Sequence, residues 1–268
     1  MRADKYFAEK FGSRTKAAEA IERGLVLVNG KTIKAKEEIK DTDEITFVKV
    51  KDVFVSNGGY KLARAIETFG LSCKDKVFAD IGASTGGFTD CLLQNGAKKV
   101  YAIDVGESLL HESLLGDERI IPMENTNARY LTKENFNEPL DGVVTDVSFI
   151  SLRLIFPAIK NILSSDGEVV ALIKPQFECE NKNIGKSGIV HTSAHAKIVE
   201  KVLNFATENG LYPFGITNAP IRKGKNIEYV VWLKPQYHGA KSVDWAVNEV
   251  KNVLSAIIDE RKTKDVQS

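Results

Sequence analysis

The fold of this chain is decided by the stretch Asp80-Ile81-Gly82-Ala83-Ser84-Thr85-Gly86-Gly87-Phe88-Thr89-Asp90, which directly follows Lys76-Val77-Phe78-Ala79. An apolar strand ends here in an acidic residue, and a glycine-rich turn then opens a helix. Gly82, Gly86 and Gly87 lack Cβ atoms, so the main chain can approach a ligand closely or adopt a positive φ. The pattern predicts the first strand, turn and helix of an α/β domain, with a ligand at the turn.

The spacing of these residues narrows the class of ligand. The stretch has neither the G-x-G-x-x-G spacing of dinucleotide sites nor the lysine of a phosphate-binding loop. An acidic strand end repels phosphate and attracts an amine, and S-adenosylmethionine carries an amine and a sulfonium but no phosphate. The next strand ends at Asp104, 22 residues beyond Gly82 and at the usual offset for a carboxylate that binds ribose hydroxyls. We therefore expect S-adenosylmethionine, with another nucleotide or no ligand as the alternative.

Individual cofactor residues follow from this interpretation. We expect Asp80 and the backbone of the turn to bind the methionine end, and Asp104 to bind the ribose. Asn127 follows the third predicted strand, and its amide can both donate to and accept from an adenine edge. The alternative for Asn127 is a polar loop residue that caps the backbone. The predicted cofactor residues are Asp80, Gly82, Ser84, Gly86, Gly87, Asp104 and Asn127.

Composition excludes several protein classes. The 268 residues are 43% hydrophobic and 27% charged, which is ordinary for a globular chain of one or two domains. No run of about 18 apolar residues predicts a membrane span, and the N-terminus shows no apolar signal region. Cys73, Cys91 and Cys179 are too far apart for a zinc site, and His191 and His195 lack a metalloprotease pattern. We expect a cytoplasmic protein without a metal site.

The chain divides near residue 55, and the part before this point has its own pattern. Helices are predicted over residues 2–11 and 14–23, and strands over 25–28, 31–33 and 44–48. Asn29-Gly30 is a strong tight-turn signal. From Gly12 to Lys36, six basic residues stand against two acidic ones, a local charge of +4. We expect residues 1–55 to form a small docking domain, since so short a segment buries little apolar surface.

Residues 56–268 form the second predicted domain, in which strands and helices alternate. This alternation predicts a parallel sheet with helices on both faces and a site at the carboxyl ends of the strands. A last helix over 243–261 places apolar residues on one face, which we expect to pack against the sheet. The predicted strands span residues 77–80, 100–104, 119–123, 141–146, 168–174, 212–218 and 227–233. The predicted helices span about 60–70, 87–95, 107–115, 150–163 and 194–209.

Four charged residues occupy suggestive positions in this second domain. Asp146 and Lys174 each end a predicted strand, Lys61 precedes the first strand, and Glu228 lies beside the last. A lysine that ends an apolar strand is costly to bury unless it is paired or functional. The residues alone leave two readings open, a catalytic cluster or a structural ion-pair cluster at the edge of the sheet.

The N-terminal segment resembles the S-four-type RNA-binding domain. The similarity rests on Ser13-Arg14-Thr15-Lys16-Ala17-Ala18 and on the segment from Ile21 to Lys31. The resemblance implies contacts that position structured RNA without reading its sequence, mostly to phosphates. Ala3 departs from the family pattern, which usually has leucine there. The implied RNA contacts are Arg14, Lys16, Arg23, Asn29 and Lys31.

The whole chain resembles the TlyA family, and the four charged residues match the Lys-Asp-Lys-Glu tetrad of FtsJ-type ribose 2′-O-methyltransferases. The fold class that we expect is therefore α/β, a Rossmann-like S-adenosylmethionine-dependent methyltransferase domain behind a small α+β RNA-binding domain. The resemblance implies 2′-O-methylation of a cytidine ribose in ribosomal RNA, with the large subunit favoured and Lys61, Asp146, Lys174 and Glu228 catalytic. Departures from the family pattern stand at Asn57, His191 and Lys225.

A lysine- and glycine-containing loop over residues 181–188 predicts a mobile flap over the RNA. Lys186 and Lys223 are its expected RNA contacts, within a basic rim that also includes Lys182, Arg222 and Lys225.

The sequence also allows two alternative functions from other protein classes. One is a non-catalytic RNA-binding or ribosome-assembly factor. The other is a membrane-active haemolysin, a label that relatives have carried.

Overall fold

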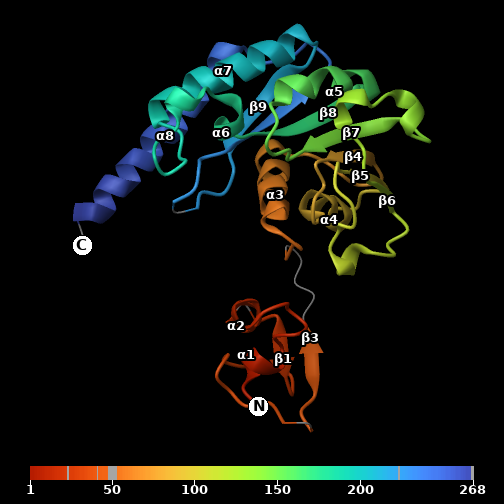
Figure 1. The fold of residues 1–268 in the computed structure, drawn as a ribbon, viewed down its shortest axis with the longest axis vertical. Helices are drawn as coiled ribbons and strands as arrows, with labels where there is room; N and C mark the ends of the chain where they lie inside the picture. Colours follow the sequence, from red (N-terminus) through yellow and green to blue (C-terminus); the bar gives the residue numbers. More distant parts are fainter. Residues whose placement is uncertain (23, 41, 48–52, 223, 267–268) are drawn as a thin grey trace. The chain divides into compact units, whose positions relative to one another are not determined.

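The computed structural model describes residues 1–22, 24–40, 42–47, 53–222 and 224–266 (Figure 1). Contacts within the chain separate it into two compact units, Met1–Val53 and Phe54–Ser268. Each unit has its own hydrophobic core, so each is described by itself.

The smaller unit is a three-stranded antiparallel sheet with two helices. The strands lie in the order β2-β1-β3 and pack with the helices around a core that includes Phe7, Ile21 and Val26. The predicted helices and strands are confirmed, although the first helix is shorter than expected. The elements are α1 (Ala3–Tyr6), α2 (Arg14–Glu22), β1 (Val26–Val28), β2 (Lys31–Thr32) and β3 (Ile45–Phe47).

The predicted tight turn joins β1 to β2. Asn29 and Gly30 have φ values of 51° and 75°, the left-handed pair that a two-residue hairpin loop requires. The Asn29 side chain donates to Asp43 Oδ1 over 3.0 Å and accepts from the backbone N–H of Glu44 over 2.9 Å. Asn29 therefore ties the turn to the segment that leads into β3.

The larger unit is built on a seven-stranded sheet in the order β6-β5-β4-β7-β8-β10-β9. All seven predicted strands are present, and the longest begins five residues earlier than expected. The strands are β4 (Val77–Ile81), β5 (Lys99–Ile103), β6 (Ile120–Met123), β7 (Leu140–Thr145), β8 (Leu163–Ile173), β9 (Tyr212–Asn218) and β10 (Tyr229–Lys234).

The expectation of a wholly parallel sheet is wrong at one edge. The pairs from β6 through β8 are parallel, but β10 runs antiparallel to both β8 and β9. Tyr229 at the start of β10 pairs with Ile173 at the end of β8. The reversed direction places the beginning of β10 at the same edge as the carboxyl ends of the parallel strands.

Helices cover both faces of this sheet, as predicted (Figure 1). The core beside α3 and α4 contains Leu62 and Phe88, and the core on the other face contains Phe156, Val199 and Val250. The helices are α3 (Asn57–Phe69), α4 (Gly87–Gln94), α5 (Phe156–Ile162), α6 (Pro175–Glu178), α7 (Thr192–Glu208) and α8 (Val243–Val266).

Two helix predictions need correction. Residues 107–115 contain only the short 3-10 turn η1 (Glu112–Leu114), because Ser108 has a φ of 53° and its N–H bonds to Glu124 instead of continuing a helix. The segment 150–163 is broken into the 3-10 turn η4 (Leu152–Leu154) and α5, and Leu163 already belongs to β8.

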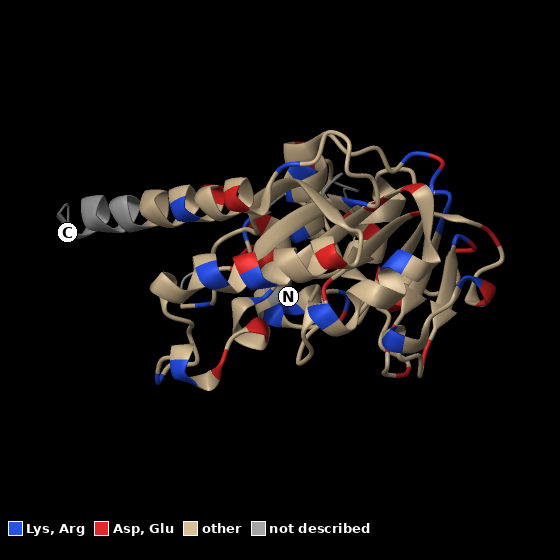
Figure 2. Cartoon of the chain, turned by 90° about the horizontal axis from the view of Figure 1, so that it is seen from above, with Lys and Arg blue, Asp and Glu red and all other residues tan. Residues whose placement is uncertain are grey.

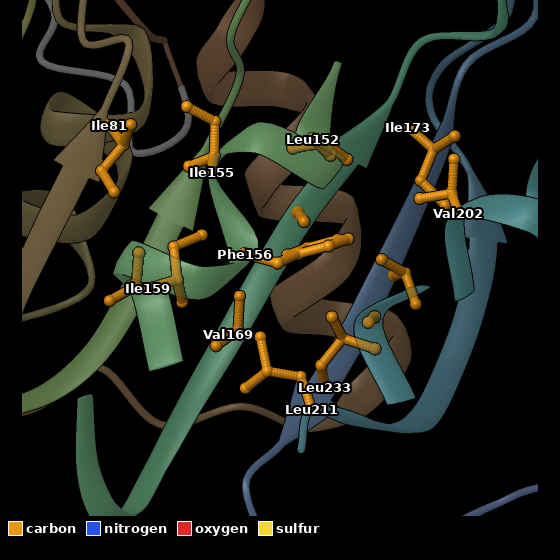
Figure 3. Close-up of a cluster of buried hydrophobic side chains, with 14 of the residues drawn as sticks. Ile81, Leu152, Ile155, Phe156, Ile159, Val169, Ile173, Val202, Leu211 and Leu233 are labelled. Atoms are coloured by element: carbon orange, nitrogen blue, oxygen red, sulfur yellow. The ribbon is translucent and has the colours of Figure 1, made fainter. Parts of the chain in front are cut away.

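Phe156, the first residue of α5, is fully buried, and its ring lies near the middle of the side chains drawn in Figure 3. Residues of α7 and α8 belong to the same core. The last helix contributes Val250, Leu254 and Ile257 to the same core, which confirms that its apolar face packs against the sheet. Among the described residues, no helix combines the length and hydropathy needed to cross a membrane.

Close packing between α3 and the segment before it generates a stability prediction. A Cβ added at Gly59 would lie 2.2 Å from Phe54 Cγ, whereas a Cβ at Gly58 would meet its nearest neighbour at 3.5 Å. We expect Gly59→Ala to lower the free energy of unfolding by about 1–3 kcal/mol, because the Phe54 side chain, its Cβ included, must shift. Gly58→Ala is the matched control and should be neutral or stabilising. Equal effects of the two variants in chemical denaturation would contradict this packing.

Candidate active site

Four residues from separate parts of the larger unit meet at the carboxyl edge of the sheet. Lys61 lies on the second turn of α3, and Asp146 follows β7 directly. Lys174 follows β8, and Glu228 precedes β10. Glu228 reaches this edge because β10 is antiparallel to β8. The topology thus brings together the four charged residues that the sequence singled out.

The four side chains form a continuous chain of ion pairs. Lys61 Nζ lies 2.8 Å from Glu228 Oε2 and 3.2 Å from Asp146 Oδ2, and Lys174 Nζ lies 2.7 Å from Asp146 Oδ1. Their side chains are only 8–17% exposed. Two cations and two anions alternate, so the cluster is neutral overall, which is the condition for burying charge at an acceptable cost.

Lys174 is surrounded by groups from the segment that follows β7 and from α6. Its Nζ donates to Ser148 Oγ over 2.7 Å and to the backbone carbonyl of Asp146 over 3.2 Å. The 2.7 Å contact with Asp146 Oδ1 has the geometry of an ion pair and not of an aligned hydrogen bond. The Phe177 ring centroid lies 5.8 Å from Nζ. Sequence reasoning missed Ser148, which stands only two residues after Asp146.

Phe149 is a second residue that the sequence reasoning missed. Its side chain is 91% exposed, and its φ of 63° is an uncommon conformation for a bulky residue. The ring lies 5.0 Å from that of Phe177, centroid to centroid. Strained backbone of this kind concentrates at functional sites. The signal available in the sequence was an aromatic residue three positions after an acid that ends a predicted strand.

Asp80 lies within β4 and is completely buried. Its Oδ2 accepts from the N–H and the hydroxyl of Thr89 on α4, over 2.9 and 2.7 Å, while Oδ1 has no hydrogen-bond partner among the described residues. Burial raises the pKa of this carboxyl to about 7, the Thr89 hydrogen bonds oppose the shift, and the nearby Asp146 and Asp104 add to it. A buried acid with a free oxygen at a strand end is suited to a cation.

The three glycines of the turn serve different purposes. Gly82 and Gly86 have φ values of 81° and 87°, and the turn depends on this left-handed backbone. Gly87 was expected to approach the cofactor, but a Cβ there would lie 2.2 Å from Ser56 Oγ and 3.1 Å from Gly58 Cα. The packing of α4 against the start of α3 therefore explains Gly87 without a ligand.

Asp104 faces the turn from the end of β5. Its two carboxylate oxygens accept from the N–H groups of Ser84 and Gly106, each over 2.9 Å, and the side chain is partly exposed. Asn127 caps the 3-10 turn η2 (Ala128–Tyr130) by accepting from the N–H of Arg129 over 3.1 Å. The side-chain oxygen of Asn127 therefore caps the backbone, as the alternative prediction for this residue stated.

A small pocket of about 120 Å³ opens beside the tetrad. Lys61 and Glu228 line its inner end, and exposed Arg222 and Lys225 line its outer end. The loop that carries the exposed Lys186 is hydrogen-bonded to Asn226, which also lines this pocket. Asn226 accepts from the N–H of Val190 over 2.8 Å and donates to the carbonyl of Gly188 over 3.1 Å. Lys223 lies outside the described residues.

The smaller unit presents part of the expected RNA-binding set. Arg14 is exposed and paired with Asp4 over 3.0 Å, and Lys31 is exposed on β2. The Asn29 side chain is already hydrogen-bonded to Asp43 and Glu44, ahead of β3. Lys16 belongs to α2, but its side chain lies outside the described part of the structure, as does the whole of Arg23.

Charge is evenly mixed over the rest of the larger unit. Acidic and basic residues are interspersed on its helices and strands (Figure 2), in keeping with a net charge of +1 for the whole chain. Within the described residues, no group of three or more His, Cys, Asp or Glu side chains is placed to hold a metal ion. Any attraction for a polyanion therefore depends on local groups of cations.

Comparisons with known proteins agree with this arrangement. Residues 54–235 match the family model described as FtsJ-like methyltransferase, and residues 1–45 match the S4 domain. Hemolysin A of Brachyspira hyodysenteriae is 44% identical over 86% of this chain and 98% of its own length. The "16S/23S rRNA (cytidine-2'-O)-methyltransferase TlyA" of Mycobacterium tuberculosis is 38% identical over 91% of this chain and 92% of its own.

A solved structure described as "Putative hemolysin from Streptococcus thermophilus" is 41% identical and covers 99% of this chain and 98% of its own, with a TM-score of 0.73. The family match spans more than half of the chain, and it includes the glycine turn and all four members of the ion-pair cluster. The chain belongs to the FtsJ-like methyltransferase family and carries an S4 domain ahead of the methyltransferase domain.

Proposed function

We propose that this protein is a cytoplasmic enzyme that transfers a methyl group from S-adenosylmethionine to the 2′-hydroxyl of a cytidine in ribosomal RNA. The observation that carries the proposal is the largely buried Lys61–Asp146–Lys174–Glu228 cluster, which lies at the same sheet edge as the glycine turn. Relatives of similar length are named as methyltransferases of cytidine in 16S and 23S or in 23S rRNA. Of these, we favour the large-subunit RNA as substrate.

The residues present fit S-adenosylmethionine. Asp80 offers a buried oxygen without a partner, suited to the amine. Gly82 and Gly86 hold the left-handed backbone of the turn, and Ser84 lies on the exposed side of it. Asp104 is partly exposed at the next strand end, where each of its oxygens keeps a lone pair for a ribose hydroxyl. We assign Asn127 to the adenine edge through its amide N–H group.

S-adenosylmethionine supplies a methyl group on a sulfonium sulfur, and the C–S electron pair remains on sulfur when the methyl passes to oxygen. A ribose hydroxyl is a weak nucleophile, so the protein must hold it in line and stabilise the charge that develops on it. Lys174, which lies 2.7 Å from Asp146 Oδ1, supplies that positive charge, and the hydroxyl proton leaves to water. Lys61 and Glu228 orient Asp146 from the other side.

We assign RNA binding to two regions, within proposed domains at residues 1–55 and 56–268. The S4 domain positions the RNA through Arg14, Lys16, Arg23, Asn29 and Lys31. The rim of the active site, with Lys186, Arg222 and Lys225, binds the strand near the target, and we also assign an RNA contact to Lys223, which lies outside the described residues. Exposed Phe149 offers a ring on which a base can stack.

The first test is methyl transfer by a Lys174→Ala variant. We expect kcat on ribosomal RNA to fall by about a thousandfold or more, because the charge opposite the developing alkoxide is lost. Binding of S-adenosylmethionine, measured by calorimetry, should be unchanged. Purified protein, labelled cofactor and separate unmodified 50S subunits, 30S subunits and tRNA give the measurement, with Lys98→Ala at the far end of the sheet as control. Normal turnover by Lys174→Ala would refute the assignment.

The pKa of Asp80 near 7 predicts a pH-dependent affinity for the cofactor. The carboxylate form binds the amine, so the affinity of the wild type should rise roughly tenfold between about pH 6 and about pH 8. Asp80→Asn should bind more weakly and without this dependence. A pH-independent wild-type affinity would place Asp80 away from the amine.

The pH dependence of folding stability is an independent measurement of the Asp80 carboxyl. The folded-state pKa is raised, so the folded protein holds the proton more tightly than the unfolded chain does. The stability of the wild type without cofactor, relative to Asp80→Asn, should therefore fall as the pH rises from about 4 to about 7, and it should level off above that pH.

The basic rim predicts a salt effect. Lys186→Ala should weaken RNA binding and reduce the slope of log K against log salt by about one, since one phosphate contact is lost. Lys98→Ala, a lysine paired with Glu138, is again the control. Unchanged affinity and slope in Lys186→Ala would exclude that residue from the RNA-binding surface.

A further inference from the structure

Ser148 is the exposed partner of a buried lysine. The Lys174 side chain is 8% exposed, whereas Ser148 is open to solvent. Lys174 Nζ donates to Ser148 Oγ and to the Asp146 carbonyl, and Asp146 Oδ1 lies 2.7 Å from it as an ion-pair partner. A hydroxyl that arrives from solution therefore meets Ser148 before it meets Lys174.

The Ser148 hydroxyl retains an unused donor. Its oxygen accepts from Lys174, and its own O–H has no acceptor among the described residues. A serine hydroxyl can accept and donate at the same time. A donor that itself accepts from a cation is polarised by it, which strengthens the bond it gives to a third group.

The loop that carries Ser148 is fixed at both ends. The N–H of Asp146 donates to the carbonyl of Ile81, over 3.2 Å. At the other end, buried Glu178 accepts from Ser151 Oγ over 2.6 Å and from the N–H of Leu152 over 2.7 Å. Between these anchors the backbone is strained at Phe149. Such strain persists where the surroundings hold it in place, so the position of Ser148 is set by the fold.

We propose that Ser148 is a further catalytic residue, whose hydroxyl donates a hydrogen bond to the ribose 2′ oxygen while it accepts from Lys174. The influence of the ammonium thus reaches the nucleophile through Ser148, and the bond strengthens as negative charge develops on that oxygen. Ser148 keeps its proton throughout. This inference rests on the proposed function and adds a residue to the same site.

The test compares Ser148→Ala, Ser148→Thr and Ser148→Cys in the full-length protein with labelled cofactor and ribosomal RNA. We expect kcat to fall by about a hundredfold in Ser148→Ala, the usual effect of removing one donor to a developing oxyanion. The KM for RNA, the dissociation constant of S-adenosylmethionine and the Tm should stay near those of the wild type. Ser148→Thr keeps the hydroxyl and should recover most of kcat.

Ser148→Cys is nearly isosteric but has only a weak S–H donor, so it should be as slow as Ser148→Ala. If the alanine variant folds poorly, Ser148→Cys still tests the loss of the hydroxyl donor. Ser72→Ala, an exposed serine elsewhere on the same unit, is the matched control and should turn over normally.

The outcomes separate this inference from the proposed function. A wild type that methylates RNA, with Ser148→Ala retaining kcat or raising only KM, would overturn the role of Ser148 alone. A slow Ser148→Thr would do the same, because the hydroxyl would then not be the group that matters. A wild type that transfers no methyl group to any ribosomal RNA would overturn the proposed function and this inference together.

Discussion

A lysine at the end of a central strand can remain charged inside a protein only if other charges surround it. Lys174 stands at this position, and the arrangement of the site follows from the need to neutralise it. Asp146 balances Lys174 on one side and Lys61 on the other, and Glu228 completes the alternation. Removal of any one member leaves the cluster with a net charge in a poorly solvated place, so the cluster holds the relative positions of four elements.

The direction of one strand makes this arrangement possible. In a wholly parallel sheet the residue before a strand lies at the edge opposite the site. Because β10 runs antiparallel between β8 and β9, Glu228 comes to the same edge as Asp146 and Lys174. The same reversal brings Asn226, which holds the loop with Lys186, beside the tetrad. A single topological feature therefore serves both the ion pairs and the rim.

The glycine turn combines two constraints within six residues. Gly82 and Gly86 allow a left-handed backbone near Asp80 and Asp104, where acidic groups gather. Gly87 allows α4 to lie against the start of α3, the helix that carries Lys61. The cofactor side and the catalytic side of the site are thus joined by the packing of two helices.

Much of this protein is determined by its sequence alone. The strand, turn and helix around Asp80, the tight turn at Asn29-Gly30, the seven strands and the four charged residues depend on local spacing and on the chemistry of single residues. The catalytic role of the four charged residues was predicted from the family resemblance, because the residues alone also allowed a structural ion-pair cluster.

Only the tertiary structure decided the direction of β10, the loss of a helix after Asp104, the packing role of Gly87 and the enclosure of Lys174 by Ser148. Each of these depends on contacts between segments far apart in the chain, such as Ser108 with Glu124 or Gly87 with Ser56. Local sequence patterns do not show which distant segments will lie side by side, because burial and strand pairing are determined only when the whole domain folds.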